Sequence, residues 1–100
     1  MLSIVIPAYN EAARLPRTLP EVMGYLTTGP SAWELLLVDD GSSDSTRVLM
    51  ERAAADHAAG GRAGVVRVLA EPHRGKAAAV RAGVLAAAGE AILFADADLS

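Results

Sequence analysis

Acidic side chains follow three short apolar runs of this sequence, at points where a strand would end and a turn would begin. These residues are Glu11, Asp39, Asp40, Asp44, Asp96 and Asp98. Carboxylates that are brought together repel one another unless a cation or a ligand with hydrogen-bond donors offsets their charge. The pattern therefore predicts a binding site for a divalent cation or for a polar ligand.

The spacing of Asp96 and Asp98 is the most informative part of this pattern. At an extended strand end, residues i and i+2 point the same way, so both carboxylates can face one point across the small Ala97. Carboxylate oxygens suit Mg²⁺ or Mn²⁺, and such ions often bind phosphate groups as well. The alternative is that one aspartate caps the next turn and the other is solvated, because D-x-D alone is a common pattern. Its position after a buried strand favours the cation.

The segment VDDGSSDST (38–46) is typical of a strand-to-helix turn, in which Gly41 would permit a tight bend. Asp39 or Asp40 would accept a hydrogen bond from a ribose hydroxyl or a base N–H, as acids do after the second strand of nucleotide-binding folds. The alternative is that these side chains only build the turn and cap the helix. We expect ligand binding for Asp39, and both interpretations stay open for Asp40.

The segment HRGKAAAVRAG (73–83) places Arg74 and Lys76 on either side of Gly75 at a helix start. A helix N-terminus with flanking cations suits a phosphate group, although a solvated basic turn is the more general interpretation. Neither G-x-x-x-x-G-K-[ST] nor G-x-G-x-x-G occurs in the sequence. Their absence argues against a P-loop NTPase and a dinucleotide dehydrogenase.

Four apolar runs rich in Val, Ile and Leu must position these residues. The runs are LSIVIP (2–7), WELLLV (33–38), VVRVLA (65–70) and AILFA (91–95). Nearly continuous apolar runs indicate strands buried on both faces, and the segments between them are helical in character. Strands that alternate with helices predict a parallel sheet with right-handed crossovers, whereas an α+β domain with antiparallel strands is the alternative.

The predicted fold is therefore a Rossmann-like three-layer α/β sandwich with a mainly parallel sheet. With the strand order 3-2-1-4, the direction of winding reverses between the first and fourth strands. A ligand crevice forms at such a point, outside the carboxyl ends of the strands. We expect the acidic residues to line that crevice.

Local signals place the helix boundaries. Pro16 suits a first helical turn, and Pro20 should kink or restart that helix. Ser43 is a suitable N-cap for the second helix, and Gly89 is a suitable C-cap for the third.

Composition limits the class of protein. The chain has 100 residues, a formal net charge of −3 and 52% hydrophobic residues, which suits one small domain. The mild acidity argues against nucleic-acid binding. There is no cysteine, no apolar run long enough to span a membrane and no signal-peptide pattern, so a cytoplasmic protein is expected. His57 and His73 have no metal-ligand spacing and are expected at the surface, whereas Trp33 is expected in the core or at its rim.

Three ordered motifs resemble those of the family 2 inverting glycosyltransferases with the A-type fold. They are SIVIPAYNEAARLPRTL, LLLVDDGSSDST and EPHRGKAAAVRAGVLAAAGEAILFADADLS, which together cover nearly the whole chain. The details R-G-K-x-x-A-V-R-x-G and F-x-D-A-D-L-S look most like the branch that transfers glucose or a similar hexose to a polyprenyl or dolichyl phosphate. The resemblance implies a metal-assisted, inverting enzyme that uses a UDP- or GDP-linked sugar donor and a lipid-phosphate acceptor, at the cytoplasmic face of the membrane.

The resemblance also implies roles for individual residues. The nucleotide-sugar pocket would be lined by Pro7, Ala8, Tyr9, Glu11, Asp39, Lys76, Asp96 and Ala97. Tyr9 would lie against the base, Asp39 would contact the base or ribose, and Lys76 would lie near the phosphates. Asp96 would face the ribose or sugar, and Asp98 would bind Mg²⁺ or Mn²⁺.

The family pattern extends further than this sequence. Because the acceptor-side residues of the family follow D-x-D, residues 1–100 are expected to be the N-terminal nucleotide-sugar-binding part of a longer domain, inactive alone, with catalytic residues beyond residue 100. The unpaired edge of the fourth strand would favour a dimer. A nucleotidyltransferase and a non-catalytic nucleotide-binding module are the alternative functions.

Overall fold

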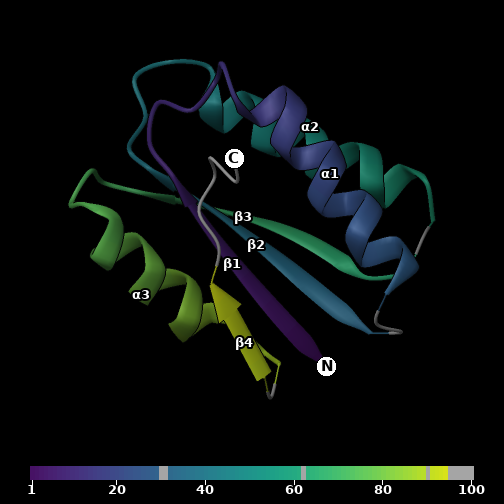
Figure 1. Ribbon diagram of the computed structural model, residues 1–100. Coiled ribbons are helices and arrows are strands. Elements are labelled where there is room, and N and C mark those ends of the chain that lie inside the picture. Colours follow the sequence, from purple (N-terminus) through teal and green to yellow (C-terminus); the bar gives the residue numbers. More distant parts are fainter. Residues whose placement is uncertain (30–31, 62, 90, 95–100) are drawn as a thin grey trace.

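The computed structural model describes residues 1–29, 32–61, 63–89 and 91–94. Four strands alternate with three helices along the chain (Figure 1). In order they are β1 (Leu2–Ala8), α1 (Leu15–Thr28), β2 (Trp33–Asp40), α2 (Thr46–Ala59), β3 (Val65–Glu71), α3 (Lys76–Ala86) and β4 (Ala91–Phe94). The predicted alternation of strands and helices is confirmed.

The four strands form one parallel sheet in the order β3-β2-β1-β4. This is the predicted order, and it excludes the antiparallel alternative for the described strands. The winding direction reverses between β1 and β4, so the carboxyl end of β1 lies at the point where such sheets bind ligands. Strands β3 and β4 are the outer strands of the described sheet, and dimerisation through an edge stays a prediction.

Helices cover both faces of the sheet, which gives the predicted three-layer α/β sandwich (Figure 1). Successive side chains of a strand point to opposite faces, so each strand contributes to two cores. Ile6, Leu35 and Leu37 pack with α1 and α2 on one face. Val5, Leu36 and Val38 pack with α3 on the other. The nearly continuous apolar runs are thus explained by burial on both faces.

Helix α3 lies close to the sheet because small residues face it. Ala79 is fully buried against the sheet. A Cβ atom added at Gly83 would come within 2.3 Å of Cγ1 of Val5, so a larger residue would force α3 outward. The Ala- and Gly-rich composition of this helix therefore sets the distance between two layers.

Two predicted helix boundaries are wrong. Helix α2 begins at Thr46 with Ser45 as its N-cap, and the hydroxyl and backbone N–H of Ser43 donate to Oδ1 of Asn10 instead. Helix α3 ends at Ala86, three residues before Gly89. The Gly89 N–H donates to Oγ of Ser3 at 2.8 Å, and a Cβ atom there would lie 2.3 Å from the same oxygen. Gly89 is therefore needed for close approach to β1 rather than as a cap.

The prolines of α1 have different outcomes. Pro16 lies in the first turn, as predicted. Pro20 lies inside α1, which runs without a break from Leu15 to Thr28, so the predicted restart is wrong. Strand β2 also extends two residues beyond its predicted end and includes Asp39 and Asp40.

A buried acid joins three strands and the end of α3 near the start of the sheet. Glu34 is 3% exposed, and its carboxylate accepts hydrogen bonds from the Ser3 hydroxyl, the Ala88 N–H and the Arg67 guanidinium. Arg67 also donates to the carbonyl oxygen of Ala86 at 2.9 Å. Burial raises the pKa of Glu34, but these hydrogen bonds and the charge of Arg67 more than offset it, so the pKa is lowered. The carboxylate is therefore fully used by the fold.

His57 and Trp33 form a second joint near the start of the sheet. The His57 side chain is buried, its Nε2 lies 3.1 Å from the carbonyl oxygen of Gly64, and its ring contacts that of Trp33. The predicted surface position of His57 is therefore wrong, because its side chain is covered by Trp33 and by Gly64, the residue just before β3. The predicted core position of Trp33 is confirmed, since Trp33 is 2% exposed.

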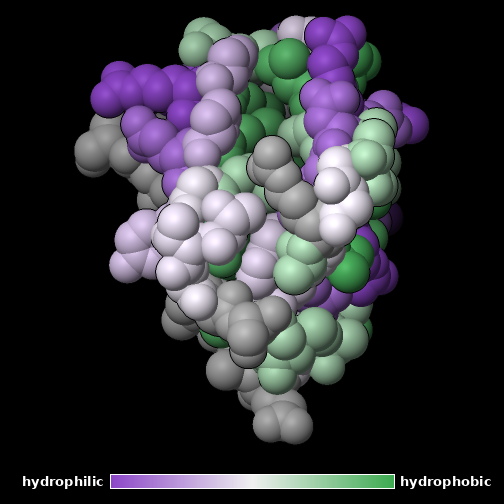
Figure 2. Space-filling view, turned by 90° about the vertical axis from the view of Figure 1, so that its right-hand side faces the viewer, coloured by the Kyte–Doolittle hydropathy of each residue, from purple (hydrophilic) through white to green (hydrophobic). Residues whose placement is uncertain are grey.

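The outer surface mixes polar and apolar residues. From the side at which the strands begin, hydrophobic atoms are visible between columns of hydrophilic side chains (Figure 2). Exposed apolar side chains include Tyr25 on α1 and Leu85 on α3. Isolated residues of this kind are ordinary on protein surfaces. Among the described helices, none combines the length and apolar character that a membrane span requires.

Candidate functional site

Three connecting segments follow the carboxyl ends of β1, β2 and β3. Parallel pairing sets their starting points, because Ala8 lies opposite Asp39 and Asp40 lies opposite Glu71. The segments that follow are residues 9–14, 41–45 and 72–75. Side chains from distant parts of the sequence therefore meet along the edge of the sheet that the carboxyl ends of the strands form, as the sequence predicted.

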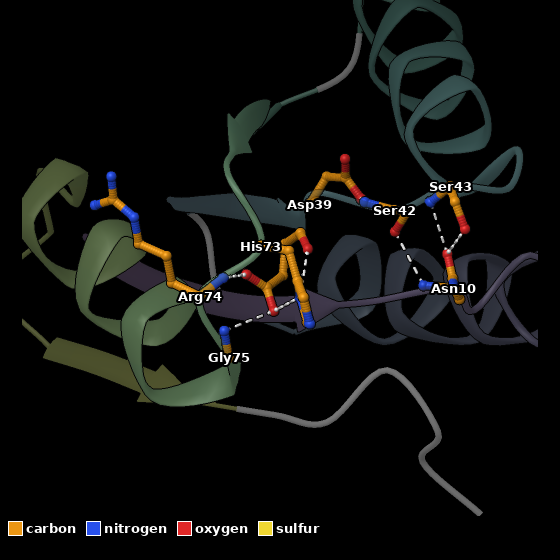
Figure 3. A network of polar contacts seen from close by, with 8 residues as sticks. Asn10, Asp39, Ser42, Ser43, His73, Arg74 and Gly75 are labelled. Carbon is orange, nitrogen blue, oxygen red and sulfur yellow. Dashed lines mark hydrogen bonds and ion pairs between the residues drawn. The ribbon is translucent and has the colours of Figure 1, made fainter.

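Asn10 joins the first two segments. Its φ of 51° is positive, a conformation that asparagine tolerates better than most residues. Its backbone N–H donates to Oγ of Ser42 at 2.9 Å, and its Oδ1 accepts the N–H of Ser43 at 2.8 Å (Figure 3). The neighbouring Glu11 N–H donates to Oγ1 of Thr46 at 2.8 Å. The β1–α1 segment is thus fixed against the start of α2.

Asp44 strengthens the same junction. Its carboxylate accepts hydrogen bonds from the hydroxyl and N–H groups of Thr46 and from the N–H of Ala12. The hydrogen bond from the Thr46 hydroxyl is the main reason why the pKa of Asp44 is lowered. Because both of its carboxylate oxygens accept hydrogen bonds within the junction, we assign Asp44 to the joining of the two segments.

Asp40 joins the second segment to the third. Its side chain is buried, and its carboxylate accepts the backbone N–H groups of Arg74 at 2.9 Å and Gly75 at 3.1 Å. Nδ1 of His73 lies 3.0 Å from the same carboxylate (Figure 3). Of the two interpretations left open for Asp40, the structural one fits best, but the residue holds the β3–α3 segment rather than its own turn.

His73 forms an aromatic pair with Tyr9. The two ring centroids are 4.0 Å apart and the rings are inclined by 19°, which is a stacked arrangement. The predicted surface position of His73 is confirmed. The residue is solvent-exposed, but its ring is fixed between Tyr9 and Asp40.

Asp39 lies beside this network and points to the other face of the sheet. Adjacent strand residues face opposite sides, so Asp39 is on the side of α1 and α2 whereas Asp40 is on the side of α3. Asp39 is 3% exposed, and its Oδ1 accepts the N–H of Ser42 at 3.2 Å. The carboxylate is therefore held at the end of β2. Asp39 lies opposite Ala8 of β1 in the strand pairing.

The structure places the other predicted residues as follows. Pro7 and Ala8 are buried at the end of β1. Glu11 is half-buried and pairs with Arg14 at 3.1 Å. Lys76 is the exposed first residue of α3, after Gly75 with a φ of 99°. These residues, with Tyr9 and Asp39, lie at one edge of the sheet.

The predicted metal motif falls in a part of the chain that is not described. Asp96, Ala97 and Asp98 lie outside the described residues. Within the ranges that are described, no three His, Cys, Asp or Glu side chains gather closely enough to hold a metal ion. The assignment of Asp98 to a metal ion therefore stays a prediction.

A hollow of about 340 Å³ lies between α3 and the end of β3. Its lining residues are Glu71, Pro72, Arg74, Ala78, Ala79, Arg81, Ala82 and Leu85. Arg74, a candidate for phosphate binding, lines it, but none of the described residues that the family resemblance assigns to the nucleotide-sugar pocket does. We therefore assign the candidate site to the edge of the sheet and not to this hollow.

Sequence reasoning missed Asn10 and the pairing of His73 with Tyr9. The position of Asn10 next to Tyr9 in PAYNE carried a weak signal, because asparagine often adopts positive φ values in turns. The stacking of His73 had no signal in the sequence, since it depends on how the β3–α3 segment folds over Gly41.

Comparisons with known proteins agree with this geometry. The model of the family described as glycosyl transferase family 2 matches residues 3–100. A dolichyl-phosphate beta-glucosyltransferase from Trichomonas vaginalis is 38% identical over 97% of this chain and 30% of its own length. An undecaprenyl-phosphate 4-deoxy-4-formamido-L-arabinose transferase from Salmonella paratyphi A is 37% identical over 98% of this chain and 29% of its own length.

A solved structure extends the comparison to three dimensions. A mannosyltransferase from Pyrobaculum calidifontis, determined in complex with GDP-Man and Mn²⁺, matches with a TM-score of 0.82 and 29% identity. The match covers 97% of this chain and 27% of that protein. This chain therefore spans less than a third of the length of the relatives that it matches.

Proposed function

The chain belongs to glycosyl transferase family 2, and on that premise we propose that it is the N-terminal, nucleotide-sugar-binding part of an inverting glycosyltransferase. The donor would be a UDP- or GDP-linked hexose such as glucose, and the acceptor a polyprenyl or dolichyl phosphate. The two relatives described above are named as transferases that act on lipid phosphates. The Pyrobaculum structure holds a nucleotide sugar and Mn²⁺.

One observation carries the proposal for this chain. An exposed aromatic ring, Tyr9, directly follows β1, at whose carboxyl end the winding of the sheet reverses, and a buried carboxylate, Asp39, lies at the end of the adjacent parallel strand β2. A flat apolar ring suits stacking with a nucleobase, and a carboxylate suits the N–H groups of a base or the hydroxyls of a ribose. Both groups are held by hydrogen bonds or stacking within the protein, so they are in place before a ligand arrives.

The remaining residues are assigned by their positions. Lys76, the first residue of α3, would face the phosphates, because a helix start and a cation both favour anions. Pro7, Ala8 and Glu11 would line the pocket. Ala97, which follows β4 in the sequence, would complete it. Asp96 would contact the ribose or sugar.

Asp98 would hold Mg²⁺ or Mn²⁺, since these ions prefer carboxylate oxygens. When bound, such an ion neutralises charge on the departing nucleoside diphosphate. The protein's own residues would bind the base, orient the ribose and hold the diphosphate.

The transfer step is a displacement at the anomeric carbon. An oxygen of the lipid phosphate attacks from the face opposite the diphosphate and forms the new C–O bond. The bond from the anomeric carbon to the diphosphate oxygen breaks, and the diphosphate leaves with the electron pair. An anionic phosphate oxygen needs little deprotonation, so the described residues need not supply a general base. A lipid acceptor would place the enzyme at the cytoplasmic face of a membrane.

Calorimetric titration with UDP and GDP, with and without Mn²⁺, tests the proposal. We expect metal-dependent binding of one of the two, and a loss of about tenfold in affinity for Asp39→Asn, because the ligand loses a charged acceptor. The substitution keeps an oxygen for the Ser42 N–H, and Glu71→Gln on β3 is the matched control. Stronger binding of nucleoside triphosphates would indicate a nucleotidyltransferase, and no nucleotide binding would overturn the proposal.

A further inference from the structure

We propose that His73 is a positioning residue for the nucleobase: it holds the Tyr9 ring in place as a stacking surface. This inference rests on the proposed function and deepens it, because it concerns the same pocket. It assigns a role to a residue that neither the motif resemblance nor the acidic pattern singled out.

The first support is the way in which His73 is fixed. Nδ1 of His73 lies 3.1 Å from the backbone oxygen of Asp40 and 3.0 Å from its Oδ2. A carbonyl oxygen can only accept, so Nδ1 must carry the proton and donate to Asp40. The same carboxylate accepts the N–H groups of the next two residues, Arg74 and Gly75. Asp40 therefore holds the imidazole ring directly, and it also holds the backbone of the two residues that follow His73.

The second support is the space made for His73. Gly41 has a φ of 67°, and a Cβ atom added there would lie 2.5 Å from the backbone nitrogen of His73 and 2.9 Å from its Cβ. Only glycine combines this conformation with the absence of a side chain. The β2–α2 turn thus lets the β3–α3 segment pass directly over it, and His73 reaches Tyr9.

The third support is the aromatic pair itself. Tyr9 is 41% exposed although His73 stacks on it at a centroid distance of 4.0 Å, so the stack leaves part of Tyr9 accessible. A ring that is already ordered loses less conformational freedom when a base stacks on it. Figure 3 shows that the Arg74 side chain extends away from His73 and Gly75, so Arg74 contributes to this arrangement through its backbone N–H.

The arrangement also couples two parts of the proposed pocket. His73 and Lys76 belong to one short segment, and Asp40 holds that segment by three groups. The ring would support the base while Lys76, three residues later, would face the phosphates. Asp40 therefore sets the relative position of the two ends of the nucleotide, without itself contacting the ligand.

A set of variants at His73 tests the inference by calorimetry with UDP or GDP and Mn²⁺. We expect His73→Ala and His73→Asn to weaken binding by about fivefold, because both lose the ring. His73→Phe, which keeps a flat ring, should stay within about twofold of the parent chain. Binding of Mn²⁺ with inorganic pyrophosphate, which has no base, should not change in any of the three.

A double-mutant cycle with Tyr9→Ala supplies the second readout. If His73 acts through Tyr9, His73→Ala should have no further effect once Tyr9 is removed. Equal losses in both backgrounds, an equal loss for pyrophosphate, or no rescue by phenylalanine would overturn the inference. Tighter binding by His73→Ala would also overturn it, because His73 would then occupy the place of the base. If the parent chain binds pyrophosphate but no nucleotide, the proposed function fails as well.

Discussion

Two buried carboxylates occupy opposite ends of β2, and their different surroundings separate the structural end of the sheet from the binding end. Glu34 and Asp40 are six residues apart on the same strand, so both point toward α3, and each is 3% exposed. Glu34 accepts the N–H of Ala88, just after α3. Asp40 accepts the N–H of Gly75, just before α3. The two acids thus hold both ends of one helix against the sheet.

Their partners differ in kind. Glu34 is surrounded by the Ser3 hydroxyl and by Arg67, whose guanidinium also binds the carbonyl oxygen of Ala86. The residues that donate hydrogen bonds to Glu34 have no role in the proposed pocket. Asp40, in contrast, orients His73, which contacts Tyr9. The same residue class on the same face therefore stabilises the fold at one end and orients residues of the proposed pocket at the other.

The largest expected effect is the loss of stability in Glu34→Ala. This change leaves the Ser3 hydroxyl and the Ala88 N–H without their acceptor at a buried site, and Arg67 loses its ion pair. We expect the free energy of unfolding to fall by about 3 kcal/mol, measured by urea denaturation. Nucleotide affinity of the folded protein should not change, because the site lies at the opposite end of the sheet.

The control for this variant is Glu51→Ala on α2. Glu51 forms only an exposed pair with Arg47 at 3.5 Å, so the expected loss is below about 0.5 kcal/mol. If Glu34→Ala weakened nucleotide binding as strongly as it weakened folding, the two ends of the sheet would not be separate in function.

Asp40→Ala should lower nucleotide affinity but have only a small effect on stability, the reverse of Glu34→Ala. The N–H groups of Arg74 and Gly75 lie near the surface, where water can replace the carboxylate, so we expect a loss of about 1 kcal/mol in stability. Nucleotide affinity should fall by about fivefold, because the whole segment that carries His73 is released, whereas His73→Phe keeps the hydrogen bonds of Arg74 and Gly75 to Asp40. Calorimetry and urea denaturation of the same sample measure both quantities. Asp56→Ala, at an exposed position on α2, is the control, and unchanged affinity in Asp40→Ala would contradict the comparison.

The arrangement of the sheet was predictable because its signals are local and repeated. Four apolar runs alternate with helical segments, which predicts parallel crossovers, and the order 3-2-1-4 that was assumed for them is the observed one. The boundaries at Ser43 and Gly89 were wrong for a different reason. Both residues have the right chemistry for a cap, but Ser43 donates its hydroxyl and its N–H to Asn10, and Gly89 donates its N–H to Ser3.

The candidate site was predictable only in part. The positions of Tyr9, Asp39 and Lys76 at one edge followed from where the strands end. The role of Asp40 and the stacking of His73 did not follow, because they depend on the path of a segment that is 33 residues away in sequence. Sequence patterns also could not distinguish Glu34, which lies inside an apolar run, from a residue at the edge of the core.

The smallest expected effect, and the sharpest test of the comparison, is the pH dependence of stability. Because the pKa of Glu34 is lowered below its ordinary value of 4.5 by its hydrogen bonds and by Arg67, its ionised form stabilises the folded state. That contribution is complete above the unfolded-state pKa and is lost as the pH falls through the lower, folded-state pKa. Urea denaturation between about pH 7 and about pH 3 should therefore show a loss of stability on the acid side that is reduced in Glu34→Gln. Asp44→Asn is the matched control at the binding end, where the pKa is also lowered but the carboxylate is exposed, so its effect should be smaller. A larger effect for Asp44→Asn would mean that the acid-sensitive joint of the sheet lies at the binding end and not at Glu34.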